Sequence, residues 1–345
     1  MILIVTNKED IHPTPVIEHL ERMGTPFFRL NTESLLSDYD FEWTCNPTTR
    51  SDFRLKNIRT GLEVFGHEIG SVWERRPIVP SELRISNIDE INSHNLKEAH
   101  GFLSFLLYYL GDKYCLGHHL FDRSSASKML QLKLALELGM SIPDTCFSNN
   151  KSAISTFASR HNIICLKSID NDNIWFDNTL REYVLYTQAV KSEELLSLSD
   201  DAFTQTVSYL QEYIEKDFEL RITVVGDNVF ACKIDSQQMD KNSGQIDWRQ
   251  GLDCGLKHTK YVLPSSIANS CRTFLHKLHL NFGCFDFIVT PKGEYVFLEC
   301  NPNGQWLWIE QETGMEISKC IAETLLKHDV KIRNNKVRKY GNSNN

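Results

Sequence analysis

Two apolar runs near the C-terminal end of the chain predict a β-hairpin with an acidic residue in each strand. The runs Cys284–Thr290 and Tyr295–Asn301 flank Pro291–Glu294, which supplies the proline and the glycine of a short loop. Each run is apolar enough to be buried, yet each carries one carboxylate away from the loop. A buried carboxylate costs free energy unless it has a partner, so this hairpin has to provide one.

The predicted register places the two carboxylates opposite each other. With a four-residue loop, Thr290 faces Tyr295 and Asp286 faces Glu299. Opposed Cβ atoms in an antiparallel pair are about 4.5–5.5 Å apart, so the two charges would repel each other. Asn301 follows Glu299 by two residues and points to the same face. Removal of either carboxylate is therefore expected to relieve repulsion.

Two chemistries would allow these carboxylates to stay ionised. A cation can lie between them, and the oxygen-only set of Asp286, Glu299 and Asn301 suits Mg²⁺, which is commonly shared with substrate phosphates. Alternatively, the acids lie at a wet strand end and form salt bridges with a nearby lysine or arginine. The spacing alone leaves both interpretations open.

The composition limits the classes of protein to which the chain can belong. With 345 residues, 41% of them hydrophobic, the chain is long enough for two or three globular domains. No apolar run approaches the roughly 20 residues that cross a bilayer, so we expect no membrane association. Met1–Thr6 predicts a buried strand and not a signal peptide, so we expect a cytoplasmic protein. The net charge of −8 argues against nucleic-acid binding.

The cysteines and histidines predict neither disulfides nor a zinc site. The ten cysteines are scattered without a Cys-x-x-Cys pair, which favours free thiols in a reducing compartment. The pairs His118/His119 and His276/His279 have no cysteine at ligand spacing.

The order of the predicted elements indicates a mixed α/β (α+β) chain. Residues 1–30 predict a strand, a helix and a second strand, as in a parallel α/β unit. Helices are predicted for 88–110 and 122–139, and a strand for 163–167. Residues 329–345 are basic and predict a disordered tail.

Two motifs resemble those of a known enzyme family. Leu298-E-C-N-P-N-G-Q-Trp306, with Asp286 thirteen residues before Glu299, resembles the C-terminal signature of the ATP-grasp ligases, and of the microviridin-type peptide macrocyclases (the graspetide group) in particular. Val72-W-E-R-R-Pro77 is similar to the N-terminal pattern of the same group. The resemblance to ATP-grasp ligases covers roughly residues 115–325.

This resemblance implies an ATP-grasp fold in three parts. Residues 1–118 would form an N-terminal α/β (pre-ATP-grasp) domain, 119–208 the central subdomain, and 209–328 the C-terminal subdomain with the metal site. It also implies an activity on a ribosomally made precursor peptide with a leader and a core. ATP phosphorylates an Asp or Glu side chain of the peptide, and a Thr or Ser hydroxyl or a Lys amine then forms an ester or an amide. Such ligases are expected to be homodimers.

The resemblance assigns roles in nucleotide binding to four residues. Lys128 and Lys167 match the two lysines that hold the phosphates of ATP, and a lysine is a compact charge suited to that task. Glu212 and Ile214 lie in the segment that would bind adenine through its backbone groups.

Further carboxylates would bind the ribose and the metal. Glu219 would hold the ribose hydroxyls, although Glu215 is close enough in sequence to compete. Asp286, Glu299 and Asn301 match the magnesium ligands of the family, which implies ATP with two Mg²⁺ ions as the cofactors.

Three cations are candidates for the phosphoryl-transfer step. Arg221 and Lys233 lie on consecutive predicted strands, and we expect hairpin pairing to bring both over the γ-phosphate. Arg249 is a candidate for holding the transferred phosphoryl group or the carbonyl oxygen. The alternative for Arg249 is a salt bridge with Asp247 or Asp253.

One segment departs from the family pattern, and other functions would use the same residues. Residues 168–178 contain no glycine, so the lid over the phosphates must differ from the glycine-rich loop of many ATP-grasp enzymes. The alternatives are a ligase that adds an amino acid to a protein or metabolite, a kinase that stops at phosphate transfer, and a non-catalytic nucleotide-gated peptide-binding protein. The full set of metal ligands and phosphate lysines argues against the last.

Overall fold

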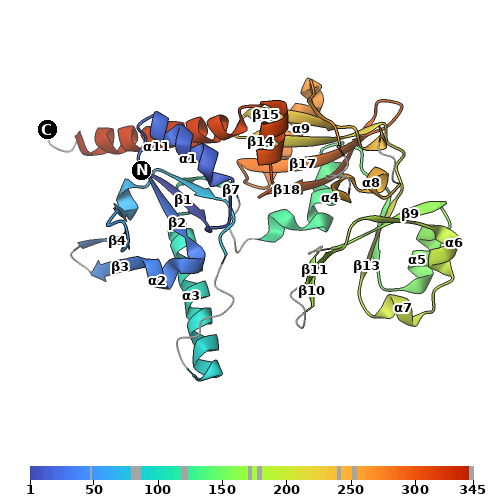
Figure 1. Cartoon of the computed structure of the whole chain (residues 1–345), viewed down its shortest axis with the longest axis horizontal. Helices are drawn as coiled ribbons and strands as arrows, with labels where there is room; N and C mark the ends of the chain where they lie inside the picture. Colours follow the sequence, from blue (N-terminus) through green and yellow to red (C-terminus); the bar gives the residue numbers. More distant parts are fainter. Residues whose placement is uncertain are drawn as a thin grey trace.

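The structure is a computed structural model that describes residues 1–46, 49–78, 87–117, 123–169, 173–176, 181–238, 242–250 and 255–341. Its elements follow one another in three parts, each built around a four- or five-stranded sheet (Figure 1). This is the mixed α/β architecture that the sequence predicts. In the part of the chain described, no helix has the length and apolar character needed to cross a membrane.

The N-terminal part is built on a parallel sheet. Its elements are β1 (Ile2–Thr6), α1 (Pro13–Arg22), β2 (Phe27–Asn31), η1 (Thr32–Ser34), α2 (Leu35–Asp38), β3 (Tyr39–Asn46), β4 (Thr49–Asn57), β5 (Glu63–Phe65), η2 (Gly66–Glu68), β6 (Ser71–Glu74), α3 (Asp89–Tyr109) and β7 (Tyr114–Gly117). The sheet has the order β2-β1-β6-β7, and β3, β4 and β5 form a separate antiparallel sheet. Alternate residues of β1 point to opposite faces, so Ile2 packs with α1 whereas Leu3 packs with α3.

The central part is a small antiparallel sheet, and its last three helices pack on one face of that sheet. Its elements are η3 (Arg123–Ala126), α4 (Lys128–Glu137), β8 (Thr145–Ser148), α5 (Lys151–Ala158), β9 (Ile163–Lys167), β10 (Asn173–Phe176), β11 (Arg181–Val184), β12 (Gln188–Lys191), α6 (Ser192–Leu196), α7 (Asp201–Thr204) and β13 (Ser208–Glu212). The sheet has the order β12-β9-β13-β8. Ile154 and Phe157 of α5 pack with Ile164 and Leu210 in one core.

The C-terminal part is an antiparallel sheet that carries the predicted hairpin. Its elements are β14 (Phe218–Val225), β15 (Asn228–Ile234), η4 (Ser236–Gln238), α8 (Asn242–Ile246), β16 (His258–Lys260), α9 (Ser265–Lys277), β17 (Phe282–Val289), β18 (Tyr295–Asn301), α10 (Leu307–Thr313) and α11 (Ile317–Gly341). The order is β16-β15-β14-β17-β18. Phe274 of α9 packs against Phe285 and Phe297 on one face of this sheet.

The hairpin brings the two carboxylates together through a register that differs from the predicted one. Asp286 pairs with Glu299, as predicted. Tyr295, however, pairs with Val289 and not with Thr290, because the loop is one residue longer on that side. A register shift between Asp286 and Phe287 restores the predicted pairing beyond the irregularity.

Helix α11 corrects the prediction of a disordered basic tail. The helix continues to Gly341, so residues 329–341 are helical, and only 342–345 lie outside the described residues. Asp329 is buried and accepts a hydrogen bond from the amino group of Met1 at 2.7 Å. Helix α11 begins at the C-terminal sheet and runs alongside α1 of the N-terminal part (Figure 1), so it ties the two parts together.

Candidate active site

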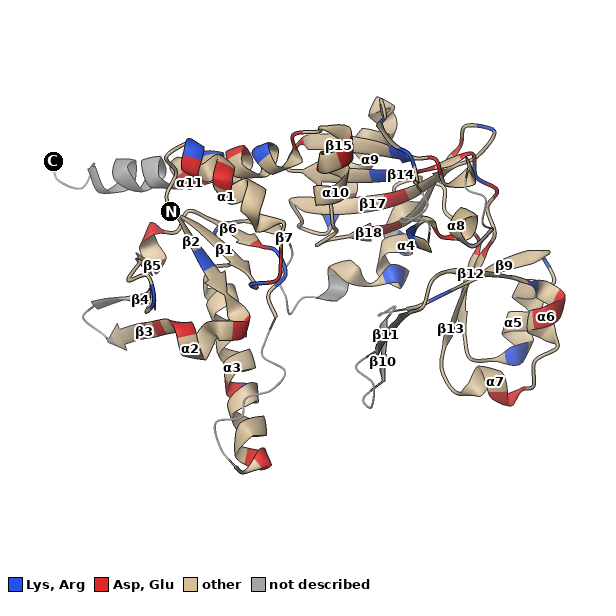
Figure 2. Cartoon of the chain, viewed as in Figure 1, with Lys and Arg blue, Asp and Glu red and all other residues tan. Residues whose placement is uncertain are grey.

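A cleft of about 820 Å³ contains most of the predicted site residues. Its walls come from the ends of β9 and β13 in the central part and from β14, β17 and β18 in the C-terminal part. Basic and acidic residues occur on neighbouring elements here (Figure 2), and ion pairs join Lys128 with Glu299 and Arg221 with Asp286. The cleft therefore has a polar and highly charged floor, which suits a phosphorylated ligand.

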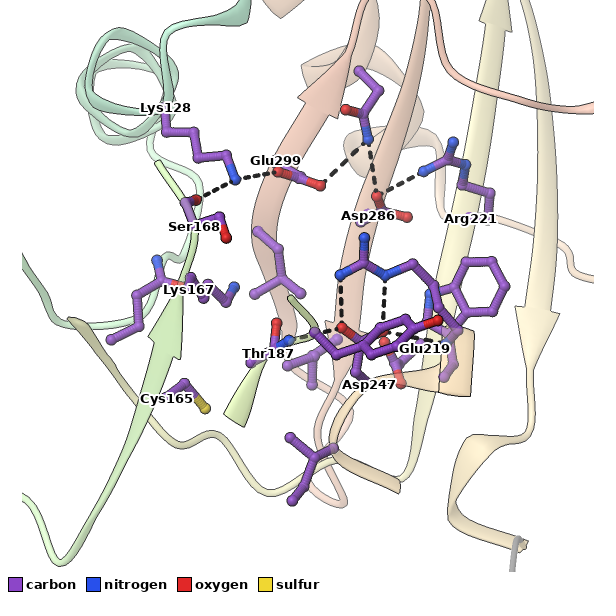
Figure 3. Close-up of a pocket in the computed structure, with 18 of the residues that line it drawn as sticks. Lys128, Cys165, Lys167, Ser168, Thr187, Glu219, Arg221, Asp247, Asp286 and Glu299 are labelled. Atoms are coloured by element: carbon purple, nitrogen blue, oxygen red, sulfur yellow. Dashed lines mark hydrogen bonds and ion pairs between the residues drawn. The ribbon is translucent and has the colours of Figure 1, made fainter. Parts of the chain in front are cut away.

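The acidic patch lies on two neighbouring strands, β17 and β18. The Asn301 Nδ2 atom lies 3.3 Å from Asp286 Oδ2 and 3.3 Å from Glu299 Oε1 (Figure 3). Arg221 Nη1 donates to Asp286 Oδ2 at 2.7 Å, and Lys128 Nζ lies 3.5 Å from Glu299 Oε2. Each carboxylate thus has a cationic partner from the protein, as in the salt-bridge alternative, and both carboxylates face the cleft.

The pKa values of the two acids shift in opposite directions from their usual ranges, although the cationic partners act to lower both. Burial raises the pKa of Asp286; Arg221 opposes that shift, and the Glu299 carboxylate adds to it. Burial also acts to raise the pKa of Glu299, but Lys128 and Lys167 hold it below its usual range. A proton taken up by this pair therefore resides on Asp286.

The patch fits a magnesium ion by its donor chemistry. Asp286, Glu299 and Asn301 provide two carboxylates and one side-chain amide, and a half-turn of the amide would present its oxygen to the acids. In the described ranges no three His, Cys, Asp or Glu side chains cluster as metal ligands, and the described cysteines are free thiols. Oxygen donors of this kind, without His or Cys, select Mg²⁺ over zinc.

The contact with Arg221 adds a cost to the loss of Asp286 that opposes the expected relief of repulsion. Asp286→Asn leaves Arg221, which is 7% exposed, without its anionic partner, and should lower the free energy of unfolding by about 2–3 kcal/mol. Glu299→Gln should change it by less than about 1 kcal/mol, because Lys128 is more exposed. Urea unfolding of both variants checks this contrast, and equal stabilities would contradict it.

The two predicted phosphate lysines enter the cleft from different elements. Lys128 is the first residue of α4, whose N-cap Ser127 accepts a hydrogen bond from Leu130 N, and its Nζ donates to Ser168 O at 2.8 Å. Lys167 ends β9, where burial lowers its pKa and the Glu299 carboxylate opposes that shift. Both Nζ atoms lie about 6 Å from the centre of the Tyr209 ring, at 5.7 and 6.0 Å.

The Glu212 side chain, at the end of β13, is held by contacts within the protein. Glu212 Oε1 accepts a hydrogen bond from Asp144 N at 3.0 Å, and Oε2 lies 3.6 Å from His161 Nδ1. Ile214 follows and lines the cleft. The adenine contact through the backbone of this segment stays a prediction.

Glu219, and not Glu215, faces the cleft. Glu219 Oε1 accepts hydrogen bonds from Lys216 Nζ at 2.7 Å and from Ser236 Oγ at 2.8 Å. Glu215 is exposed and does not line the cleft. Lys216 also donates to Ile246 O, so it links Glu219 to the segment that ends α8. Lys216 is a site residue that the sequence does not predict, although it precedes Glu219 by only three residues.

Arg249 combines the two alternatives considered for it. It forms a two-point ion pair with Asp247, with Nε–Oδ1 and Nη2–Oδ2 distances of 2.9 and 2.7 Å, and it also lines the cleft. Asp247 accepts a hydrogen bond from Thr187 N at 3.0 Å, and the Arg249 guanidinium lies 5.5 Å from the centre of the Tyr186 ring. The pair therefore joins the central and C-terminal parts across the cleft. Asp253 lies outside the described residues.

Lys233 is not at the site, which corrects the prediction. Lys233 pairs with Leu220, whereas Arg221 pairs with Cys232, so Lys233 and Arg221 point to opposite faces of the sheet. Lys233 Nζ forms an ion pair with Asp235 at 2.7 Å and does not line the cleft. The sequence predicts that both cations lie on one strand pair, but their faces depend on the register of that pair.

The comparisons with known proteins agree with this geometry. The RimK-like ATP-grasp domain model matches residues 127–325. A RiPP-associated ATP-grasp ligase of Chryseobacterium gregarium, solved with ADP and a leader and core peptide, is 29% identical, with a TM-score of 0.84 over 94% of this chain and 96% of that one. The macrocyclase MdnC of Microcystis aeruginosa MRC, solved with the precursor peptide MdnA, is 28% identical, with a TM-score of 0.80 over 94% and 99%.

A third solved structure shares the fold at lower identity. The ATP-grasp ligase PsnB, complexed with a minimal precursor, is 14% identical and has a TM-score of 0.74 over 95% of this chain and 98% of that one. A comparison with curated proteins gave no match.

Proposed function

This chain belongs to the RimK-like ATP-grasp family, and from that premise we propose that it is an ATP-dependent macrocyclase that joins side chains of a ribosomally made peptide. The observation that carries the proposal is the meeting of Lys128, Lys167, Asp286, Glu299 and Asn301 in one cleft. A phosphate site beside an oxygen-donor metal site is what phosphoryl transfer from ATP requires. The similarity to two ligases solved with peptides supports a peptide substrate.

In the proposed reaction the cleft binds ATP along its length. The backbone after β13, including Ile214, would receive adenine, and Glu219 the ribose hydroxyls. Lys128 and Lys167 would hold the phosphates. Asp286, Glu299 and Asn301 would hold two Mg²⁺ ions. Bound Mg²⁺ would neutralise negative charge on the phosphates.

The peptide carboxylate would then become an acyl phosphate. An oxygen of a peptide Asp or Glu attacks the γ-phosphorus, the bond to the β-phosphate oxygen breaks, and ADP leaves. The cleft residues mainly position the two reactants and balance the charge that moves. Arg221, held against Asp286, and Arg249, held against Asp247, are placed to stabilise oxygens of the transferred group.

Ring closure would follow without a dedicated base. A Thr or Ser hydroxyl, or a Lys amine, attacks the acyl carbon and expels phosphate, giving an ester or an amide. The acyl phosphate supplies the driving force for this step. We further propose that the enzyme acts in the cytoplasm, as a homodimer, on a precursor with a leader and a core.

The mass of the product tests this proposal. We expect the precursor to be a Thr- and Asp/Glu-rich peptide encoded beside its gene. With ATP, Mg²⁺ and this precursor, the protein should give products lighter by about 18 Da per link, because each closure formally removes one water. Mass spectrometry measures this change, and mild base should reverse it for esters but not for amides.

Other outcomes identify the alternative activities. A kinase would make the peptide heavier, and an amino-acid ligase would add a residue mass. If the full-length precursor keeps its mass while ADP accumulates only with a free amino acid, the macrocyclase proposal is wrong and the amino-acid ligase takes its place.

A further inference from the structure

The motif Val72–Pro77 brings two adjacent arginines to the cleft from the N-terminal part. The first, Arg75, is 1% exposed. Its Nη1 donates to Asn303 O at 2.6 Å, and its Nε lies 3.5 Å from Asp10 Oδ2. Arg75 therefore connects the end of β6 to the loop after β18, the strand that carries Glu299 and Asn301.

The second arginine, Arg76, has a fixed backbone and an exposed side chain. Its carbonyl oxygen accepts a hydrogen bond from Asn7 Nδ2 at 2.7 Å. Pro77 restricts the backbone of Arg76, the residue before it. Ile78 N then donates to Thr32 Oγ1 at 2.8 Å. The position of Arg76 in the wall is therefore defined, while its guanidinium is left in the open cleft.

Arg76 differs from most other cations of the cleft, because those cations form ion pairs with carboxylates. Four of them have a carboxylate partner: the pairs are Lys128–Glu299, Lys216–Glu219, Arg221–Asp286 and Arg249–Asp247. Within the described ranges, Arg76 and Lys167 line the cleft without such an ion pair. Lys167 is one of the two expected phosphate lysines, whereas Arg76 follows Arg75, which is hydrogen-bonded to Asn303 O in the loop after β18.

We propose that Arg76 binds an Asp or Glu carboxylate of the peptide substrate at the metal end of the cleft. This inference rests on the proposed function. A guanidinium donates two parallel hydrogen bonds to a carboxylate but has no acceptor for the NH₂ of an amide, so Arg76 would select acidic over amide side chains. It would act on the peptide and not on the nucleotide, because it comes from the N-terminal part beside the loop after β18, whereas the expected adenine segment follows β13 in the central part.

Binding of two peptides to two proteins tests this role. The peptides are the precursor encoded beside the gene and the same precursor with its core Asp and Glu replaced by Asn and Gln. Calorimetry with ADP and Mg²⁺ gives each affinity. We expect the wild-type protein to bind the acidic peptide more tightly than the amide peptide. In Arg76→Gln the ratio of these two affinities should fall roughly tenfold, which is the coupling expected of one charge-assisted pair.

Matched variants separate recognition from a structural effect. Arg22→Gln removes an exposed arginine at the end of α1, outside the cleft, and should keep the full preference. Arg76→Lys keeps the positive charge and should keep part of the preference for the acidic peptide. The KM for ATP should not change in either Arg76 variant. Full preference in Arg76→Gln overturns the inference. Absence of any lighter product from the wild-type protein instead overturns the proposed function, independently of these affinities.

Discussion

Glu299→Gln is expected to abolish ADP formation while the fold stays intact. The substitution keeps the size of the side chain but removes one of two carboxylates proposed to hold Mg²⁺. Loss of one ligand should remove about 4 kcal/mol of charge stabilisation, which corresponds to roughly a 1000-fold slower reaction. A coupled assay of ADP release, with ATP and the precursor peptide in excess, measures the rate.

A surface substitution of the same type controls for this result. Glu18→Gln removes an exposed carboxylate that pairs with Arg22 on α1, and it should leave the rate within about twofold. Glu299→Gln should also retain the circular dichroism spectrum and unfolding midpoint of the wild type. A rate near the wild-type value, with an unaltered dependence on Mg²⁺ concentration, would rule out Glu299 as a metal ligand.

The pairing of Asp286 with Glu299 shows what local sequence rules can predict. Asp286 and Glu299 could be placed opposite each other because alternation and a short loop leave few registers. The pairing is correct although the loop is longer than predicted, since the irregularity next to Asp286 compensates for it. A shift of one residue without this compensation would have moved one acid to the other face of the sheet.

The misplaced residues depend on contacts that local sequence patterns do not determine. Lys233 was assigned to the site from its strand, but which face it occupies depends on its pairing with Leu220. Residues 329–341 were predicted to be disordered from their charge, yet α11 is anchored by the contact of Asp329 with the amino group of Met1. Composition cannot reveal a partner that lies at the other end of the chain.

Gly304→Ala tests whether the loop after the metal strand is held as tightly as the structure indicates. A Cβ at this position would lie 2.3 Å from Cys284 Cβ and 2.9 Å from Arg221 Nη2, so the loop or the arginine must move. We expect the free energy of unfolding to fall by about 1–3 kcal/mol, as for other overpacked sites. ADP formation should fall about 100-fold, because a displacement of about 1 Å near reacting groups has that effect.

The matched control for this substitution is Gly101→Ala in helix α3. A Cβ there meets no atom within 4 Å, and alanine favours a helix, so this variant should be more stable than the wild type by about 0.5–1 kcal/mol with unchanged activity. Urea unfolding and the ADP assay compare the two variants directly. Wild-type activity in Gly304→Ala would mean that Arg221 and the loop can move without disturbing the acids, and that Arg221 does not stabilise the transferred group.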